Sequence, residues 1–340
     1  MKIVIDDRIP YIREAMAAIT DDAVYLPGGR IRAEDVRDAD ALIVRTRTKV
    51  NKPLIEGSKV QFVATATIGY DHIDTAYLES KGITWTACPG CNATSVVQYI
   101  HCSLLAMQED FGLRLDTLTI GIVGYGRIGS RVAKLAKEQL GMRVLICDPP
   151  LQDAGTYKDI PFVSMETIAL QSDIITFHVP LTYDGPYPTF HMADEAFFHS
   201  VTRAPFIMNA SRGAVTDCGA LAVALITGKI RQAVIDTWEK EPDIDRELLD
   251  NVYIGTPHIA GYSAEGKVNA DNMVIEALCK HFNTPLPPTI TPPPLPPDFI
   301  YTGSPLELYD PRRDSEALKA QPSLFEYMRG NYPLRRETFN

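Results

Sequence analysis

Short apolar runs alternate with longer polar stretches in the first 86 residues of the chain. Four of these runs predict strands, because they are short, rich in β-branched or aromatic residues and bounded by polar segments. They span residues 2–6, 41–45, 61–66 and 82–87. The stretches between them are long enough to form helices, so the pattern predicts an α/β unit.

A second and stronger set of apolar runs begins at Leu118. Six of them predict strands, at residues 118–124, 143–148, 173–179, 204–210, 232–238 and 252–256. Helix-like stretches separate most of these runs, and such alternation predicts a doubly wound parallel sheet with right-handed crossovers. Asn92 is placed to cap a helix with apolar residues such as Val96 and Ile100 at helical spacing, and this helix is expected to lead into the second domain.

The end of the chain combines a helix, a proline-rich segment and a charged tail. Apolar spacing predicts a helix over residues 265–282, and eight prolines follow between Pro285 and Pro297. Proline fixes φ and has no N–H, so we expect residues 285–298 to form an extended, polyproline-like linker. The remaining residues are too few for a core of their own and are expected to pack on another domain or subunit.

Composition and charge argue against several classes of protein. The 340 residues are 45% apolar and 22% charged, as in ordinary globular proteins, and the chain is long enough for two domains. A net charge of −10 disfavours nucleic-acid binding, which depends on Lys and Arg side chains that replace phosphate counterions. No run approaches the roughly 20 apolar residues needed to cross a bilayer, and the first residues lack signal-peptide features, so we expect a cytoplasmic protein that binds no membrane.

Six cysteines occur without regular spacing, which is typical of reduced thiols in a reducing compartment. Cys88 and Cys91 form a CxxC in the sequence CPGC, a spacing found in redox and zinc sites. No second CxxC and no nearby HxxxH supplies further ligands, so ordinary loop cysteines are favoured and no metal site is predicted.

The sequence GYGRIG at residues 124–129 follows one predicted strand and opens a helix-like stretch. In a dinucleotide-binding turn, Gly124 permits the tight turn, Gly126 the approach of the pyrophosphate, and Gly129 close packing of helix on strand. Asp148 ends the next strand, where a carboxylate accepts hydrogen bonds from ribose hydroxyls and repels the 2′-phosphate of NADP. A plain glycine turn with a solvated aspartate is the alternative, but the strand–turn–helix context favours NAD binding.

Three later strands are each followed closely by a polar residue that suits hydroxyacid oxidation. These residues are Arg212, Glu241 and His258. Parallel strands meet at one carboxyl edge of the sheet, so the three side chains are expected to converge there. A neutral imidazole can accept the substrate hydroxyl proton, a carboxylate can orient and stabilise the imidazolium, and a guanidinium can bind the substrate carboxylate. Each residue alone is better explained as a surface or loop position; their joint arrangement favours catalysis.

Five stretches resemble, in order and spacing, the signature segments of the D-isomer-specific 2-hydroxyacid dehydrogenases. They are GIVGYGRIG, FHVPLT, MNASRGAV, DTWEKEP and TPHIAG. The resemblance implies a Rossmann NAD-binding domain at residues 95–262, inserted in a smaller flavodoxin-like α/β substrate domain at residues 1–94 and 263–284. It further implies that residues 285–298 link this core to a C-terminal dimerisation extension at 299–340.

The resemblance also assigns site residues. It gives the three polar residues above the catalytic roles already described. Beside the three glycines and Asp148, it implies cofactor contacts for Arg127, Ile128, Thr176, Asp236 and Gly261. It implies substrate contacts for Thr46, Thr67 and Tyr262.

Further stretches resemble one subgroup of this family. They are VRTRTKV, FVATATIGYDHID, CPGCNA, CDPP, DGPY, PHIAGYSAEGK and NYPLRRE. This resemblance implies a homodimer that oxidises 4-phospho-D-erythronate to 2-oxo-3-hydroxy-4-phosphobutanoate with NAD, in vitamin B6 synthesis. The chain departs from the subgroup at Thr46, where serine is common, at Gln98, where glutamate is usual, and in its shorter tail.

Arg45, Arg47 and Lys49 are spaced by two, so an extended segment would place three cations on one side, which would suit a phosphorylated substrate. An exposed basic strand end explains the spacing equally well, and only the resemblance favours a phosphate site. A 3-phosphoglycerate or other D-2-hydroxyacid dehydrogenase is an alternative, as is an NAD-sensing binding module like the corepressors of this fold. Turnover that depends on His258 would distinguish an enzyme from a sensor.

Overall fold

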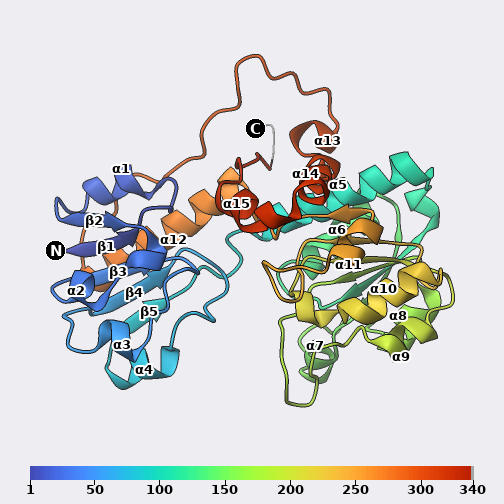
Figure 1. Cartoon of the computed structure of the whole chain (residues 1–340), viewed down its shortest axis with the longest axis horizontal. Coiled ribbons are helices and arrows are strands. Elements are labelled where there is room, and N and C mark those ends of the chain that lie inside the picture. The colour runs from blue at the N-terminus through green and yellow to red at the C-terminus, as the bar shows by residue number, and fades with distance from the viewer. Residues whose placement is uncertain (338–340) are drawn as a thin grey trace. The chain divides into compact units, whose positions relative to one another are not determined.

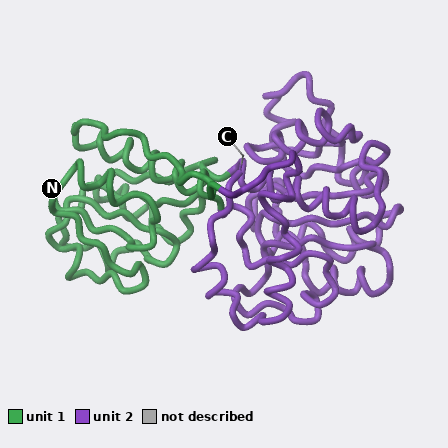
Figure 2. Tube along the Cα trace, turned by 90° about the horizontal axis from the view of Figure 1, so that it is seen from above, with its two compact units in different colours: residues 1–92, 263–297 green, residues 93–262, 298–340 purple. Residues whose placement is uncertain are grey.

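The computed structural model describes residues 1–337, which form two compact units. Unit 1 comprises Met1–Asn92 and Ser263–Pro297, and unit 2 comprises Ala93–Tyr262 and the chain from Asp298 onward (Figure 2). The proline-rich segment groups with unit 1 and the tail with unit 2. Within residues 1–337, no helix is long and apolar enough to span a membrane.

Unit 1 is a parallel sheet with helices on both faces (Figure 1). Its strands, in the spatial order β2-β1-β3-β4-β5, are β1 (Ile3–Asp6), β2 (Ala23–Leu26), β3 (Ala41–Val44), β4 (Phe62–Thr65) and β5 (Thr84–Thr86). One face packs on α1 (Ile12–Ala17) and α12 (Ala264–Phe282), and the other on α2 (Ala33–Val36), α3 (Lys52–Ile55) and α4 (Thr75–Ser80). Side chains alternate between the two cores, since Ile3 and Ile5 enter one and Val4 the other.

The four strands and the late helix predicted for this unit are confirmed, but β2 was not predicted. Its four residues are all half-buried, at the edge of the sheet. Two aspartates precede it and Pro27 follows it, so its sequence AVYL gives only a weak apolar signal. Its position depends on pairing with β1, where Ile3 lies opposite Ala23.

Unit 2 is a six-stranded parallel sheet, and all six predicted strands are confirmed. In the spatial order β11-β10-β9-β8-β6-β7 they are β6 (Thr119–Val123), β7 (Arg143–Cys147), β8 (Ile174–Phe177), β9 (Phe206–Asn209), β10 (Gln232–Ile235) and β11 (Ile254–Gly255). One face packs on α5 (Ala93–Phe111) and α6 (Gly129–Glu138), and the other on α8 (Met165–Gln171), α9 (Glu195–Ser200), α10 (Cys218–Ile226) and α11 (Arg246–Asn251). A short helix, α7 (Pro149–Asp153), follows β7. The strand order reverses between β6 and β8, which is where such sheets bind ligands.

The proline-rich segment and the tail are both fastened to the folded units. Asn272 on α12 exchanges two hydrogen bonds of 2.9 Å with the backbone of Ile290. The tail helices α13 (Pro305–Leu308), α14 (Pro311–Ala320) and α15 (Phe325–Gly330) belong to unit 2, with α14 against α5 and β11 (Figure 1). Leu318 and Phe325 are buried in its core, and Ser315 Oγ accepts the N–H of Gly255 at 2.9 Å. The tail thus covers the edge strand of its own sheet.

Candidate active site

The glycine loop between β6 and α6 has the geometry that the sequence predicted. Gly124 has a φ of +94°, and a Cβ there would lie 2.5 Å from the carbonyl oxygen of His178. A Cβ at Gly129 would lie 1.9 Å from the carbonyl oxygen of Gly124, so only glycine fits at either position. A Cβ at Gly126, in contrast, would meet no atom within 4 Å. The loop therefore presents open backbone at the position where a pyrophosphate approaches, and its residues fit a dinucleotide.

Asp148 is fixed beside this loop by two backbone hydrogen bonds. Its Oδ2 accepts the N–H of Tyr125 at 2.7 Å, and its Oδ1 accepts the N–H of Leu151 at 3.0 Å as the N-cap of α7. Each carboxylate oxygen keeps a further lone pair, so the side chain can still accept ribose hydroxyls. Arg127 is exposed on the same loop, and Ile128 is half-buried at the start of α6.

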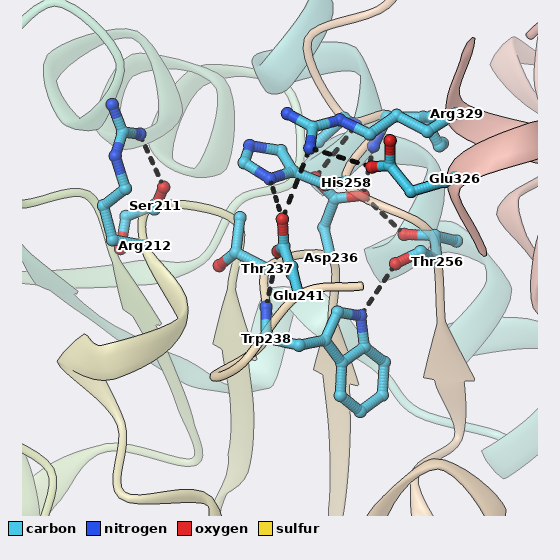
Figure 3. A network of polar contacts seen from close by, with 12 residues as sticks. Ser211, Arg212, Asp236, Thr237, Trp238, Glu241, Thr256, His258, Glu326 and Arg329 are labelled. Atoms are coloured by element: carbon cyan, nitrogen blue, oxygen red, sulfur yellow. Dashed lines mark hydrogen bonds and ion pairs between the residues drawn. The ribbon is translucent and has the colours of Figure 1, made fainter. Parts of the chain in front are cut away.

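Glu241 and His258 form a hydrogen-bonded pair beyond the ends of β10 and β11 (Figure 3). His258 Nδ1 lies 2.8 Å from Glu241 Oε2, and Glu241 Oε1 accepts the N–H of Trp238 at 2.9 Å. Burial alone would raise the pKa of Glu241, but hydrogen bonding and charge from His258, the Trp238 N–H and the charge of Arg329 outweigh burial. The net result is a pKa below the usual value, so Glu241 is an anion that can fix the orientation of the imidazole.

His258 is held by Asp236 in a strained backbone conformation. Its φ is +56°, and its N–H donates to the carbonyl oxygen of Asp236 at 2.8 Å. The buried Asp236 carboxylate accepts three further hydrogen bonds, from Thr256 Oγ1 and the N–H groups of Ile259 and Ala260. Burial raises the pKa of Asp236. Asp236 thus holds the loop around His258 in place, and its contact with a cofactor stays a prediction.

Arg212 follows β9 and lies apart from this pair, with its guanidinium bonded to neither residue (Figure 3). Within the described part of the chain, its side chain donates to the carbonyl oxygen of Ser211 at 2.9 Å. A Cβ on Gly213 would lie 2.0 Å from the carbonyl carbon of Trp238. The absence of a side chain at that position allows the Arg212 loop to pack directly on the loop that leads to Glu241.

Two arginines of the tail contact the site, and neither was predicted. Arg329 Nη1 lies 3.5 Å from Glu241 Oε2, the same oxygen that faces His258 (Figure 3). Arg335 is buried and donates five hydrogen bonds. Its acceptors are Gln98 Oε1 and the carbonyl oxygens of Ser95, Ile259, Ala260 and Tyr262. The tail therefore holds the loop that follows His258, which includes Gly261.

The contacts of Gln98 give a physical reason for this departure from the subgroup pattern. Its Oε1 accepts from Arg335 Nε at 2.9 Å, while its Nε2 donates to the carbonyl oxygen of Arg336 at 2.7 Å. A glutamate could accept the first hydrogen bond but could not donate the second. An amide at position 98 therefore suits the contacts with Arg335 and Arg336 better than a carboxylate does.

Thr176 and His178 lie at the end of β8 and bond to each other. Thr176 Oγ1 is 3.0 Å from His178 Nε2, and Thr176 is completely buried. Burial lowers the pKa of His178 to about 3, so this imidazole is neutral at physiological pH. In the part of the chain that the structure describes, its Nδ1 has no hydrogen-bond partner. The hydroxyl of Thr176 is directed to His178, and a cofactor contact by Thr176 stays a prediction.

The basic loop of unit 1 differs from its prediction. Residues 46–48 form a turn rather than an extended segment, so the three cations do not share one side. Arg45 Nε lies 3.4 Å from Asp6 Oδ2, whereas Arg47 and Lys49 line a cavity of about 410 Å³. Arg32, which was not predicted, lines the cavity too, and no acidic residue is among the described residues that line it.

The two unit 1 threonines assigned to the substrate differ in exposure. Thr46 is exposed on the turn, next to Arg47. Thr67 is half-buried, and its hydroxyl bonds to Thr65 Oγ1 at 2.6 Å and donates to the carbonyl oxygen of Gly69 at 2.9 Å. Thr46 is thus the more accessible of the two side chains.

Two further groups of cysteine or histidine side chains lie outside this site. Cys88 and Cys91 are buried, and burial raises the pKa of both thiols, that of Cys91 to about 11, so both are protonated. Among residues 1–337, no group of three His, Cys, Asp or Glu side chains is placed to hold a metal ion. His191 forms a second histidine–glutamate pair, with its Nε2 2.6 Å from Glu239 Oε1 and a φ of +48°.

Comparison with known proteins gives consistent matches. A sequence model described as the D-isomer specific 2-hydroxyacid dehydrogenase, NAD binding domain matches residues 97–260. Erythronate-4-phosphate dehydrogenase of Bacteroides fragilis is 53% identical over 341 residues, covering 99% of this chain and 97% of the relative. The protein of the same name from Escherichia coli O157:H7 is 42% identical over 356 residues, covering 99% and 92%.

Solved structures share the fold. D-lactate dehydrogenase of Aquifex aeolicus, complexed with NAD and lactic acid, matches with a TM-score of 0.66 and 24% identity, over 83% of this chain and 96% of that one. The NAD-bound 3-phosphoglycerate dehydrogenase of Entamoeba histolytica matches with a TM-score of 0.68 and 24% identity, over 83% and 95%. At this identity the likeness concerns the fold alone.

Proposed function

The chain belongs to the erythronate-4-phosphate dehydrogenases, a branch of the D-isomer-specific 2-hydroxyacid dehydrogenases, and we propose that it oxidises 4-phospho-D-erythronate at C2. It is an NAD-dependent oxidoreductase. The product is 2-oxo-3-hydroxy-4-phosphobutanoate, and the step belongs to vitamin B6 synthesis.

The observation that best supports this chemistry is the 2.8 Å hydrogen bond between His258 Nδ1 and Glu241 Oε2. Because ionised Glu241 can only accept, Nδ1 donates, and the proton-free lone pair lies on Nε2. His258 Nε2 takes up the C2 hydroxyl proton as the carbonyl forms, and Glu241 stabilises the resulting imidazolium. NAD, when bound, accepts the hydride that leaves C2.

Arg212 binds the substrate carboxylate and polarises the developing carbonyl oxygen. Its guanidinium has five donors in a planar fork, which suits both tasks. Only Nη1 donates to the described part of the chain, to Ser211, so donors are left for a ligand. Tyr262, which follows the His258 loop, contacts the same substrate.

The substrate phosphate is bound by unit 1 side chains near Thr46, with Thr67 as a further substrate contact. Arg47 and Lys49 support this assignment, because they line the same cavity as Arg32 and so bring three cationic side chains to it. Arg45 is a weaker candidate than its spacing indicated, since it pairs with Asp6.

The cofactor is bound by the glycine loop and the residues around it. The three glycines, Arg127 and Ile128 hold the pyrophosphate, and Asp148 binds the adenosine ribose. The open backbone at Gly126 supports this assignment. The remaining contacts come from Thr176, Asp236 and Gly261.

We also place the enzyme in the cytoplasm, as a homodimer. All six thiols are free, which suits a reducing compartment. Tyr327 on α15 is 65% exposed and Ile300 is 80% exposed, so a tail interface would use these two side chains. Sedimentation of the wild type should give a dimer and that of Tyr327→Ser with Ile300→Ser a monomer; a double variant that stays dimeric would exclude this interface.

A substrate panel tests the reaction. Initial rates are measured with NAD and NADP on 4-phospho-D-erythronate, D-erythronate, 3-phosphoglycerate and D-lactate. We expect the highest kcat/KM for 4-phospho-D-erythronate with NAD. D-erythronate should be at least about tenfold poorer, because a charge-assisted hydrogen bond contributes roughly 1.5–3 kcal/mol.

Two arginine variants of unit 1 separate a phosphate site from a general charge effect. Arg47→Gln should narrow the preference for the phosphorylated substrate, whereas Arg37→Gln, an exposed arginine outside the cavity, should not. Equal efficiency of the wild type on 4-phospho-D-erythronate and D-erythronate would reject the phosphate site. A preference for 3-phosphoglycerate would reject the substrate.

A further inference from the structure

We propose that Arg329, in the tail helix α15, is a positioning residue of the active site that holds the Glu241 carboxylate and opposes protonation of His258. The inference rests on the proposed role of His258 as the base. It gives the C-terminal tail a part in catalysis, because the tail supplies a charge to a site otherwise built from loops of the central sheet.

The geometry brings three charged or chargeable groups to one oxygen atom. Glu241 Oε2 lies 2.8 Å from His258 Nδ1 and 3.5 Å from Arg329 Nη1 (Figure 3). The side chains of Arg329 and Glu241 are only 23% and 17% exposed, so solvent screens their attraction less than at an open surface. The carboxylate is thus shared between a permanent cation and the base.

Arg329 is held in this position by the packing of its own helix. Phe325, one turn earlier, is 1% exposed in the core of unit 2. Glu326, on the same helix, has its Oε1 3.8 Å from Arg329 Nη1, the nitrogen that also faces Glu241. Further along the tail, the five hydrogen bonds of Arg335 fasten the chain to the loop after His258. The position of Arg329 is therefore fixed from both sides.

The charges around His258 determine the direction of the effect. Three carboxylates belong to this network: Glu241 bonds to the imidazole, Asp236 interacts with its charge, and Glu326 pairs with Arg329 on α15. All three favour the imidazolium, and Arg329 opposes them. Oxidation requires the neutral imidazole, so removal of Arg329 should shift the acidic limb of the activity profile to higher pH.

Three variants test this inference in the full-length enzyme. In Arg329→Gln, the acidic limb of the pH profile of kcat/KM should move up by about 0.5 to 1 pH unit, which is the effect expected from the loss of one nearby, partly screened charge. Arg329→Lys, which keeps the charge, should restore most of the wild-type limb. Glu326→Gln should move the limb the other way, because it removes an anion from the same helix. Opposite shifts from neighbouring residues are not expected of a merely structural role.

Arg313→Gln is the matched control, because it removes an exposed arginine from the adjacent tail helix α14. It should leave the limb unchanged. If it shifts the limb as much as Arg329→Gln does, the effect is one of net charge and the inference is wrong. An Arg329→Gln limb that overlays the wild type contradicts it as well.

A titration of His258 by NMR separates this inference from the proposed substrate. Protein labelled with ¹³C at histidine Cε1 is titrated without substrate, and His258→Asn identifies the signal. The midpoint of His258 should rise in Arg329→Gln and stay close to wild type in Arg329→Lys and Arg313→Gln. This result would hold even if 4-phospho-D-erythronate were not oxidised, and an unchanged midpoint in Arg329→Gln would overturn the inference.

Discussion

Replacement of Arg335 by methionine should destabilise unit 2 more than other single changes in the tail. The guanidinium uses all five of its donors, on Gln98 Oε1 and four backbone carbonyl oxygens, at 2.6–3.2 Å. It also lies 4.0 Å from the ring centroid of Tyr309. Methionine fills similar space but donates nothing, so five buried acceptors would lose their partner.

The expected loss follows from these contacts. Each buried acceptor left without a donor costs about 1–3 kcal/mol, but local relaxation and entry of water reduce the sum over the five acceptors. Loss of one partner from a buried charged network costs about 3–5 kcal/mol, and we take this range for Arg335→Met. Three of the five acceptors belong to residues 259–262, so kcat should fall as well under conditions in which the variant is folded.

Urea unfolding followed by tryptophan fluorescence measures this loss. Trp238 reports on unit 2, because its Nε1 donates to the carbonyl oxygen of Thr256 inside that unit. Arg313→Met, which changes an exposed arginine of α14, should alter the free energy of unfolding by no more than about 0.5 kcal/mol. A loss of less than about 1 kcal/mol in Arg335→Met would refute the view that the tail is a stabilising part of unit 2.

Two further predictions concern single carboxylates. Asp148→Ala should reduce the ratio of kcat/KM for NAD over NADP by at least about tenfold. It should also destabilise the protein by about 1 kcal/mol, because it removes the N-cap of α7. A wild type that prefers NADP contradicts the role of Asp148 in binding the ribose. Burial raises the pKa of Asp271 to about 7, above the unfolded value, so its contribution to stability is complete below about pH 4 and is lost as pH rises through 7. The free energy of unfolding of Asp271→Asn, measured in urea at pH 5 and pH 8, should exceed that of the wild type by about 2–4 kcal/mol at pH 8. An equal pH dependence of stability in the two proteins would rule out a raised pKa of Asp271.

The sheets and the glycine loop could be predicted because their signals are local. Apolar runs of strand length mark ten of the eleven strands, and each glycine of GYGRIG stands where a Cβ would collide or where the backbone must be open. Glu241 and His258 could be predicted because both follow strands that end at one edge of the same sheet. Their convergence is a consequence of topology, which the strand pattern determines.

The contribution of the tail could not be predicted in the same way. Arg329 and Arg335 contact residues that lie 73 to 240 positions earlier, and no periodicity in the tail indicates these contacts. The basic loop shows a different limit, since cations spaced by two share one side only in an extended segment, and residues 46–48 form a turn. Arg45 pairs with Asp6, whereas Arg47, within the turn, lines the cavity.

The role of His258 as the base can be tested by comparing the two histidine–glutamate pairs of unit 2. His258 and His191 are both 28% exposed, both bonded to a glutamate and both at positive φ, a conformation that asparagine tolerates. Oxidation of 4-phospho-D-erythronate with NAD is measured for His258→Asn and His191→Asn, together with NADH binding. His258→Asn should lower kcat by about 10²–10⁴-fold with NADH affinity nearly unchanged, and His191→Asn should stay close to wild type. Turnover by His258→Asn within a few-fold of wild type would contradict the assignment of His258 as the base.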